Sequence, residues 1–137
     1  MRIKIKLEVG AYAPTRKHVG DAYDLYALED TVLQPHMTTK VRTGVHMAIP
    51  YGYFGDMRSR SSMYLAGLSC EGTIDPTYTG EIMALINNGN DTPDIVHRGE
   101  RVAQIAFVKC AKTVRFKLVN ELKKTTRGAG GFGSTGK

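Results

Sequence analysis

Short apolar runs separated by turn-forming residues recur along most of this 137-residue chain. The first, RIKIKLEV over residues 2–9, alternates Ile3, Ile5 and Leu7 with charged residues, which is the period of a half-buried strand. Further runs rich in Val, Ile, Tyr and Phe lie at 44–49, 53–57, 82–86, 102–108 and 113–119. Many short strands interrupted this often predict an all-β barrel or sandwich. One or two helical turns near 62–67 are the only helix that the sequence favours.

The last eleven residues, 127–137, differ in kind from the rest, since they hold five glycines and one large apolar side chain, Phe132. Such a segment cannot form a packed core, so we expect a flexible arm when no ligand is bound. The length leaves room for one domain. We therefore predict a β-barrel domain over 1–126 and a C-terminal arm over 127–137.

The formal charge of +6 and the pI near 9.4 favour a polyanionic partner, which could be nucleic acid, a membrane surface or a phosphate ester. Solvated basic strands explain the charge equally well. No apolar run approaches the roughly 20 residues of a membrane span, and the start lacks the apolar block of a signal peptide. Cys70 and Cys110 have no metal-binding spacing around them. These features predict a cytoplasmic protein of a reducing compartment. The four histidines are interpreted as surface or loop residues: His18, His36, His46 and His97.

Two phosphate-binding signatures in the arm fail on their context. The segment 128–133 fits G-x-G-x-x-G, but this fingerprint must open a helix, and only four residues follow it. The segment 131–137 fits the start of a P-loop but lacks the Ser or Thr that completes it. Free backbone N–H groups, two hydroxyls and Arg127 still suit a triphosphate, and Phe132 could stack on a nucleobase. The alternative is a disordered linker.

Four other segments carry polar residues suited to nucleotide chemistry. Hydroxyls and arginines over 58–62 (RSRSS) suit phosphate at a helix start, although the same letters describe a solvated loop or a phosphorylation site. Asp75, before Pro76, is either an ordinary turn former or a carboxylate that deprotonates a water, with Tyr78 beside it. Asp24 is either a strand-edge residue or a holder of hydrated magnesium. Gln104, inside an apolar run, is either a core hydrogen-bonding residue or a ligand contact.

Taken together and in order, five segments resemble the trimeric dUTPase family over residues 21–136. These segments are DAYDL at 21–25, RSSM at 60–63, GTIDPTYTGE at 72–81, GERVAQ at 99–104 and RGAGGFGSTG at 127–136. The resemblance implies a jelly-roll-like, distorted β-barrel with at most one short helix and a flexible, Gly-rich C-terminal arm. It also implies a homotrimer with active sites shared between subunits and closed by the arm.

The same resemblance implies hydrolysis of dUTP to dUMP and pyrophosphate, which would sanitise the nucleotide pool and supply dUMP. Asp75 would activate the water that attacks the α-phosphorus, Tyr78 would pack on the deoxyribose, and Asp24 would hold Mg²⁺ through water. The segment from Ser69 to Met83, with Gly72, Thr73 and Ile74, would read uracil. Phosphate contacts would come from Arg60, Ser61, Ser62 and Gln104. In the arm, Phe132 would cover the uracil, and the closing residues would be Arg127, Gly133, Ser134 and Thr135.

Three other functions compete with this interpretation. A dCTP deaminase would share the fold but needs a catalytic glutamate in the strand after 72–80, where this chain has Met83-Ala-Leu-Ile86. A nucleotide-responsive binding protein would use the arm to control docking of a partner. A basic nucleic-acid-binding barrel would need an aromatic-studded basic strand face, which the sequence lacks. The partner expected is therefore dUTP, with no membrane and no nucleic acid.

Overall fold

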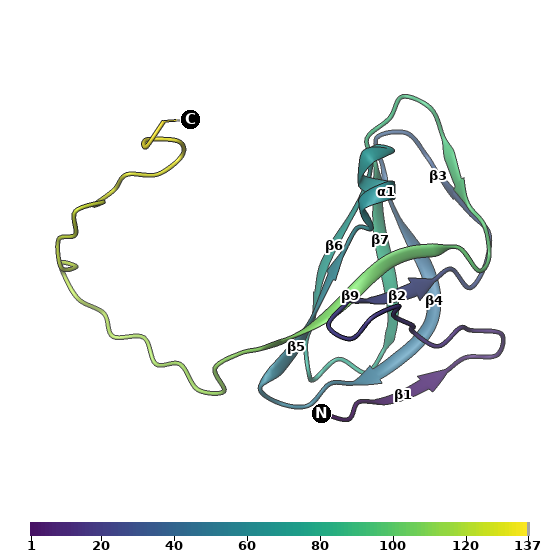
Figure 1. Cartoon of the computed structure of the whole chain (residues 1–137), viewed down its shortest axis with the longest axis horizontal. Coiled ribbons are helices and arrows are strands. Elements are labelled where there is room, and N and C mark those ends of the chain that lie inside the picture. The colour runs from purple at the N-terminus through teal and green to yellow at the C-terminus, as the bar shows by residue number, and fades with distance from the viewer. Residues whose placement is uncertain (137) are drawn as a thin grey trace.

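A computed structural model describes residues 1–136, which form nine strands and one short helix (Figure 1). The elements are β1 (Lys4–Leu7), β2 (Tyr23–Tyr26), β3 (Thr31–Leu33), β4 (Thr38–Ala48), β5 (Tyr53–Arg58), α1 (Ser61–Leu65), β6 (Leu68–Ile74), β7 (Glu81–Asn88), β8 (Asp94–Val96) and β9 (Arg101–Lys109). The fold is the predicted all-β, jelly-roll-like distorted barrel. No helix among residues 1–136 is long and apolar enough to cross a membrane.

Seven of the strands form one antiparallel sheet in the order β1-β4-β7-β6-β5-β9-β2, while β3 and β8 pair separately. β6 joins the two halves of the large sheet because its first residues, 68–70, pair with β7, whereas 71–74 pair with β5. This change of partner curls the sheet into a half-barrel, with β1 and β2 left as its two edge strands (Figure 1).

The core fills the inside of this curl with the apolar residues of the central strands. Alternate positions of β7 point inward, so that Ile82, Ala84 and Ile86 are at most 1% exposed while Leu85 is 42% exposed. Leu25, Val41, Met57 and Ile105 from four other strands complete the core. The predicted apolar runs at 44–49, 53–57, 82–86 and 102–108 therefore correspond to β4, β5, β7 and β9.

The run at 113–119, which was expected to be a strand, has no strand structure. β9 ends at Lys109, and the last backbone bond to the sheet is donated by Cys110 N to Gly52 O, at 2.9 Å. Beyond it, residues 110–136 leave the body of the molecule (Figure 1). Phe116 and Leu118 are 97% and 99% exposed. The alternation that predicted a strand is present, but within one chain the segment has no sheet edge beside it.

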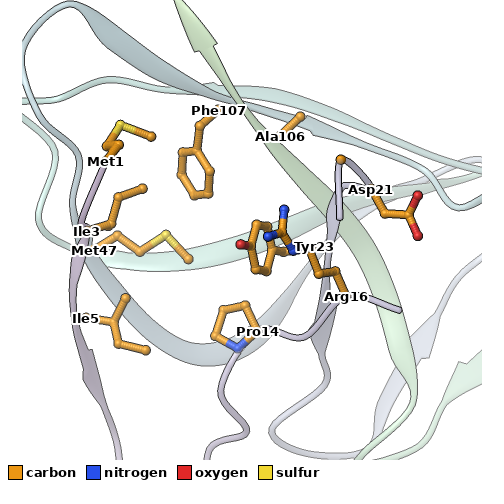
Figure 2. Close-up of a pocket in the computed structure, with 11 residues that line it drawn as sticks. Met1, Ile3, Ile5, Pro14, Arg16, Asp21, Tyr23, Met47, Ala106 and Phe107 are labelled. Atoms are coloured by element: carbon orange, nitrogen blue, oxygen red, sulfur yellow. The ribbon is translucent and has the colours of Figure 1, made fainter. Parts of the chain in front are cut away.

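β1 is also less buried than its alternation predicted, since all four of its residues are exposed. Figure 2 shows the reason: Ile3 and Ile5 point into an open pocket toward Met47 and Phe107. This pocket, of about 550 Å³, lies between the edge strands β1 and β2. The apolar face of β1 therefore borders a cavity in the single chain.

Candidate functional site

Two of the residues predicted to bind phosphate and metal, Asp24 and Gln104, lie in one row of polar residues across the sheet. Asp24 on β2 lies opposite Gln104 on β9, which lies opposite Arg58 on β5, which in turn lies opposite Glu71 on β6. Neighbouring strands lie about 4.8 Å apart, so the register alone places side chains from distant parts of the sequence side by side. Arg60 and Ser61 follow β5 at the end of this row.

Asp24 is the electrostatic centre of this cluster. Its carboxylate accepts a bond from Arg60 Nε at 3.0 Å and lies 3.5 Å from Arg101 Nη1, and its side chain is 20% exposed. A cavity of about 360 Å³ opens beside it, and four of the predicted site residues line it. The full lining is Lys17, Asp21, Ala22, Asp24, Arg60, Ser61, Arg101 and Gln104. Three cationic and two acidic side chains line this cavity, and this excess of positive charge suits a polyanion that arrives with a divalent metal.

The segment that carries Arg60 is fixed by its preceding residue, Ser59. The Ser59 hydroxyl accepts a bond from Cys70 N at 2.5 Å and donates to Cys70 O at 3.2 Å, so it continues the ladder between β5 and β6 where backbone pairing stops. The carbonyl of Ser59 accepts a bond from Gln104 Nε2 at 3.1 Å. Gln104 therefore bonds to the neighbouring backbone and also borders the cavity, and its contact with a ligand stays a prediction.

α1 confirms the short helix expected near 62–67, and glycine ends it. Gly67 has φ +79°, and a side chain at this position would meet the amide of Asn90. Asn90 Nδ2 donates to Ala66 O at 2.8 Å and Gly89 N donates to Gly67 O at 2.9 Å, so the helix end is tied to the loop after β7. This anchoring holds Ser61 at the cavity, whereas Ser62 lines neither this cavity nor the next one.

A second cavity, of about 630 Å³, adjoins the first and shares Ser61 and Gln104 with it. Its lining adds Ser69, which the sequence marked as a substrate contact, together with Tyr64, Cys70 and Glu71, which it did not. Burial raises the pKa of the Cys70 thiol to about 11, so this thiol stays protonated and unreactive near neutral pH.

Magnesium fits the first cavity only as a partner of the substrate. Among residues 1–136 no group of three or more His, Cys, Asp or Glu side chains is placed to hold a metal. Mg²⁺, however, commonly binds through one or two carboxylates, several waters and substrate phosphates. Asp24 and Asp21 line the same cavity and provide these one or two carboxylates.

The predicted catalytic residues lie on the connection between β6 and β7. Asp75 is exposed, and its carbonyl accepts a bond from Tyr78 N at 3.0 Å, which closes the expected turn. The Tyr78 hydroxyl donates to Glu81 O at 2.7 Å and the residue is 45% exposed. These two bonds fix the place of Tyr78 within the connection.

β6 and β7 are not paired with each other next to this loop, so the backbone groups on their facing edges do not bond across. Their pairing ends at Cys70 and Ile86, so the edges of 71–74 and 81–85 that face each other are not paired with each other. Gly72, Thr73 and Ile74 lie on one side of this opening and Met83 lies on the other. Unpaired backbone N–H and C=O groups are strong hydrogen-bonding groups, and a pyrimidine edge could satisfy them.

Within one chain the predicted residues form three separate groups. Asp75 lies four residues beyond Glu71, or about 13 Å along the strand from the row that contains Asp24. The arm residues form turns of their own, with Arg127 Nε donating to Gly130 O at 2.8 Å. Phe132 is fully exposed and has φ +53°. Ser134 and Thr135 are also exposed.

Sequence reasoning missed several residues that the fold brings to these groups. Lys17 and Arg101 border the Asp24 cavity, and Ser59 supports it. Lys17 reaches the cavity from the loop before β2 and Arg101 from the start of β9, so no local signal marks their place there. Ser59 belongs to the marked segment 58–62, but its bonds to β6 were not predicted. The expectation that every histidine lies on the surface or in a loop is wrong for His46, which lies within β4 with its side chain 23% exposed.

Comparisons with known proteins identify the family of this chain. Residues 10–136 match the family model described as dUTPase. The chain is 42% identical to the deoxyuridine 5'-triphosphate nucleotidohydrolase of Mycobacterium marinum, covering 96% of this chain and 92% of that protein. The corresponding Mycobacterium leprae protein matches equally well, at 42% identity with the same coverage.

Solved structures show the same likeness in three dimensions. A dUTPase variant from Staphylococcus bacteriophage 80alpha, bound to dUpNHpp, superposes with a TM-score of 0.90 at 29% identity and covers 99% of each chain. A dUTPase variant from the Staphylococcus aureus phage phi11, described as coordinating a structural Mg(II) ion, superposes with a TM-score of 0.80 at 26% identity. It covers 88% of this chain and 98% of the other.

Proposed function

Since the chain belongs to the dUTPase family and is a dUTP diphosphatase, we propose that it cleaves dUTP to dUMP and pyrophosphate by attack of an Asp75-activated water on the α-phosphorus. The observation that carries this proposal is the convergence of Asp24, Arg60, Ser61 and Gln104 on one cation-rich cavity. Family membership supports the reaction, and the positions of the other predicted residues support the roles proposed below.

The triphosphate binds at the Asp24 cavity through Arg60, Ser61 and Gln104, with Ser62 at the same helix start. Arg60 now bonds to Asp24, and its planar guanidinium can turn to form a bidentate contact with a phosphate. Lys17 and Arg101 add positive charge at the same cavity. Phosphoryl transfer needs mainly positioning and charge neutralisation, and this cavity provides both.

Asp24 would hold Mg²⁺ through water once the phosphates are in place, with Asp21 close by. Bound there, the metal would supply positive charge that neutralises the phosphates.

Asp75 provides the general base. Its carboxylate takes one proton from a water molecule as the water oxygen forms a bond to the α-phosphorus. The bond between that phosphorus and the oxygen bridging to the β-phosphate breaks, and the electron pair leaves with pyrophosphate. The exposed position of Asp75 on a hydrogen-bonded turn favours this role, because the carboxylate is accessible and its backbone is fixed.

Tyr78 and the opening between β6 and β7 select the nucleoside. The Tyr78 ring packs on the deoxyribose and leaves no room for a 2′-hydroxyl, since the bond from its hydroxyl to Glu81 O holds the ring in place. The backbone of Gly72, Thr73 and Ile74, with Ser69 and Met83, reads the uracil edge. The unpaired strand edges at this point support that role.

The arm, 127–137, closes the site. Phe132 covers the uracil, and Arg127, Gly133, Ser134 and Thr135 close on the γ-phosphate end. The full exposure of Phe132 supports this proposal, because an exposed aromatic ring gains free energy when it stacks on a base.

Complete sites then form between the subunits of a homotrimer. The separation of Asp75 from the Asp24 row in one chain supports this arrangement, because one subunit would supply the loop and another the phosphate cavity. The exposed apolar face of Val114, Phe116 and Leu118 supports it too, since a neighbour's pocket between β1 and β2 offers an apolar lining (Figure 2). Burying such side chains contributes about 1.5–3 kcal/mol each.

Incubation with dUTP, dCTP, dTTP and UTP in turn, with Mg²⁺ and heavy-oxygen water, tests the proposed function. The expected result is pyrophosphate release from dUTP alone, with the heavy oxygen in dUMP. Heavy oxygen in pyrophosphate would contradict attack at the α-phosphorus, and a preference for dCTP would contradict the assigned substrate.

A further inference from the structure

His46 lies behind the proposed catalytic loop and bonds to it with one ring nitrogen. His46 Nδ1 is 3.0 Å from Thr79 O, in the loop that carries Asp75 and Tyr78. Its other nitrogen, Nε2, is 3.1 Å from Glu8 Oε1, just beyond the end of β1. The ring therefore bridges the N-terminal strand and the loop.

Both partners of this ring are acceptors, which fixes its protonation. A backbone carbonyl has no proton to donate, and Glu8 remains a carboxylate because it is also paired with Arg42. The bond from His46 and the charge of Arg42 hold the pKa of Glu8 below its ordinary value. A histidine that donates from both nitrogens is an imidazolium, so this bridge exists only when His46 is protonated.

The remaining bonds of the loop do not depend on a proton that is lost near neutral pH. The Tyr78 hydroxyl bonds to Glu81 O. The Glu81 carboxylate accepts bonds from Arg42 Nε at 3.1 Å and from Gly44 N at 2.9 Å. Gly44 lies in the bulge of β4 and has φ +68°. Thr79 lies between Tyr78 and Glu81 in the loop, and its carbonyl is bonded to His46.

We propose that protonated His46 is a positioning residue that holds the Asp75–Glu81 loop in its dUTP-binding form, so that the KM for dUTP rises when His46 loses its proton. This inference rests on the proposed roles of Asp75 and Tyr78. Loss of the His46 proton should change mainly KM, and kcat much less. The loosened loop becomes ordered again when the nucleotide binds, and this ordering takes up part of the binding free energy. Loss of one hydrogen bond of this kind predicts a rise of roughly three- to tenfold.

The charges around His46 set the direction of its titration. The bonds to the Thr79 carbonyl and then to Glu8 raise the pKa of His46 above 6.5, while Lys6, opposite it on β1, opposes them. Lys4 on β1, Arg42 on β4 and Glu81 on β7 are the other charged groups nearby. Because the pKa is raised, the bridge is complete at mildly acidic pH and is lost as the pH rises through the raised value.

Two substitutions should move this titration in opposite directions. Glu8→Gln keeps an acceptor for Nε2 but removes the negative charge, which lowers the pKa of His46. Lys6→Met removes the opposing positive charge, which raises it. A pH dependence of KM that arises from another group would not follow these two shifts of the His46 titration.

The experiment is an NMR titration of the histidine rings in the full-length protein, paired with KM and kcat for dUTP over the same pH range. In the wild type, KM should rise with the same midpoint that NMR gives for His46. That midpoint should fall in Glu8→Gln and rise in Lys6→Met, while His36→Gln, a change at an exposed histidine, should leave it in place. In His46→Gln, KM should stay high at every pH.

Several results would overturn the proposal: a His46 ring that carries one proton at mildly acidic pH, a KM rise that persists in His46→Gln, or midpoints that do not separate in the two charge variants. If the wild type hydrolyses no dUTP, the proposed function fails, yet NMR still reports the His46 bridge. If dUTP is hydrolysed with a pH-independent KM, the proposed function stands and the role of His46 is refuted.

Discussion

Removing the Ser59 hydroxyl tests how the phosphate cavity is supported. In Ser59→Ala, Cys70 N and Cys70 O lose their bonds of 2.5 and 3.2 Å. Cys70 is only 4% exposed, so water cannot fully replace those bonds. With about 0.5–1.5 kcal/mol for each hydrogen bond, the free energy of unfolding should fall by about 2 kcal/mol. The KM for dUTP should also rise, because loss of the hydroxyl bonds loosens the backbone that carries Arg60 and the Ser59 carbonyl that accepts from Gln104.

Urea unfolding followed by circular dichroism, at one fixed protomer concentration, measures this loss. With a slope of about 1–3 kcal/mol per molar urea, the midpoint should fall by roughly 1 M. Ser59→Thr, which keeps the hydroxyl, is the matched control and should stay within about 0.5 kcal/mol of the wild type. A loss in Ser59→Ala no larger than in this control would refute the account of Ser59 as the link between β5 and β6.

Three further predictions concern the arm, the shared sites and the cysteines. Deletion of residues 127–137 should lower dUTP turnover by at least about 100-fold while the circular dichroism spectrum stays unchanged; full activity would refute the role of the arm as a lid. Mixing inactive Asp75→Asn and inactive Arg60→Ala proteins, unfolded and refolded together, should restore measurable turnover, whereas sites formed within single chains would stay inactive. Exposed Cys110 should react at once with a thiol reagent and buried Cys70 only on unfolding, and two fast-reacting thiols would contradict the burial of Cys70.

The alternation of apolar residues predicted the strands that supply their own core. β7 is an example, because Ile82, Ala84 and Ile86 face inward at every second position. The same rule failed at 113–119, since period-two alternation indicates an apolar face without indicating which surface will cover it. Within one chain nothing covers Phe116, and no local pattern distinguishes that case from an ordinary strand.

The candidate site was predictable where its residues are adjacent in sequence. Asp75 and Tyr78 lie on one turn, and Arg60 and Ser61 lie at one helix start, so local patterns marked them. Lys17 was missed because it reaches the cavity from the loop before β2, and the supporting role of Ser59 was missed because its partner Cys70 lies on the next strand. His46 was misjudged because its partners come from β1 and from the loop before β7.

Substitution of Asp75 by Asn, with turnover and dUTP binding measured on the same preparation, is the decisive test of Asp75 as the general base. Asn keeps the shape of the side chain but cannot accept the proton of the attacking water. Turnover should fall by about 100- to 10,000-fold relative to the wild type, while the affinity for dUTP in the presence of Mg²⁺ should stay within a few fold of the wild-type value. Undiminished turnover in this variant would contradict Asp75 as the general base and the proposed mechanism with it.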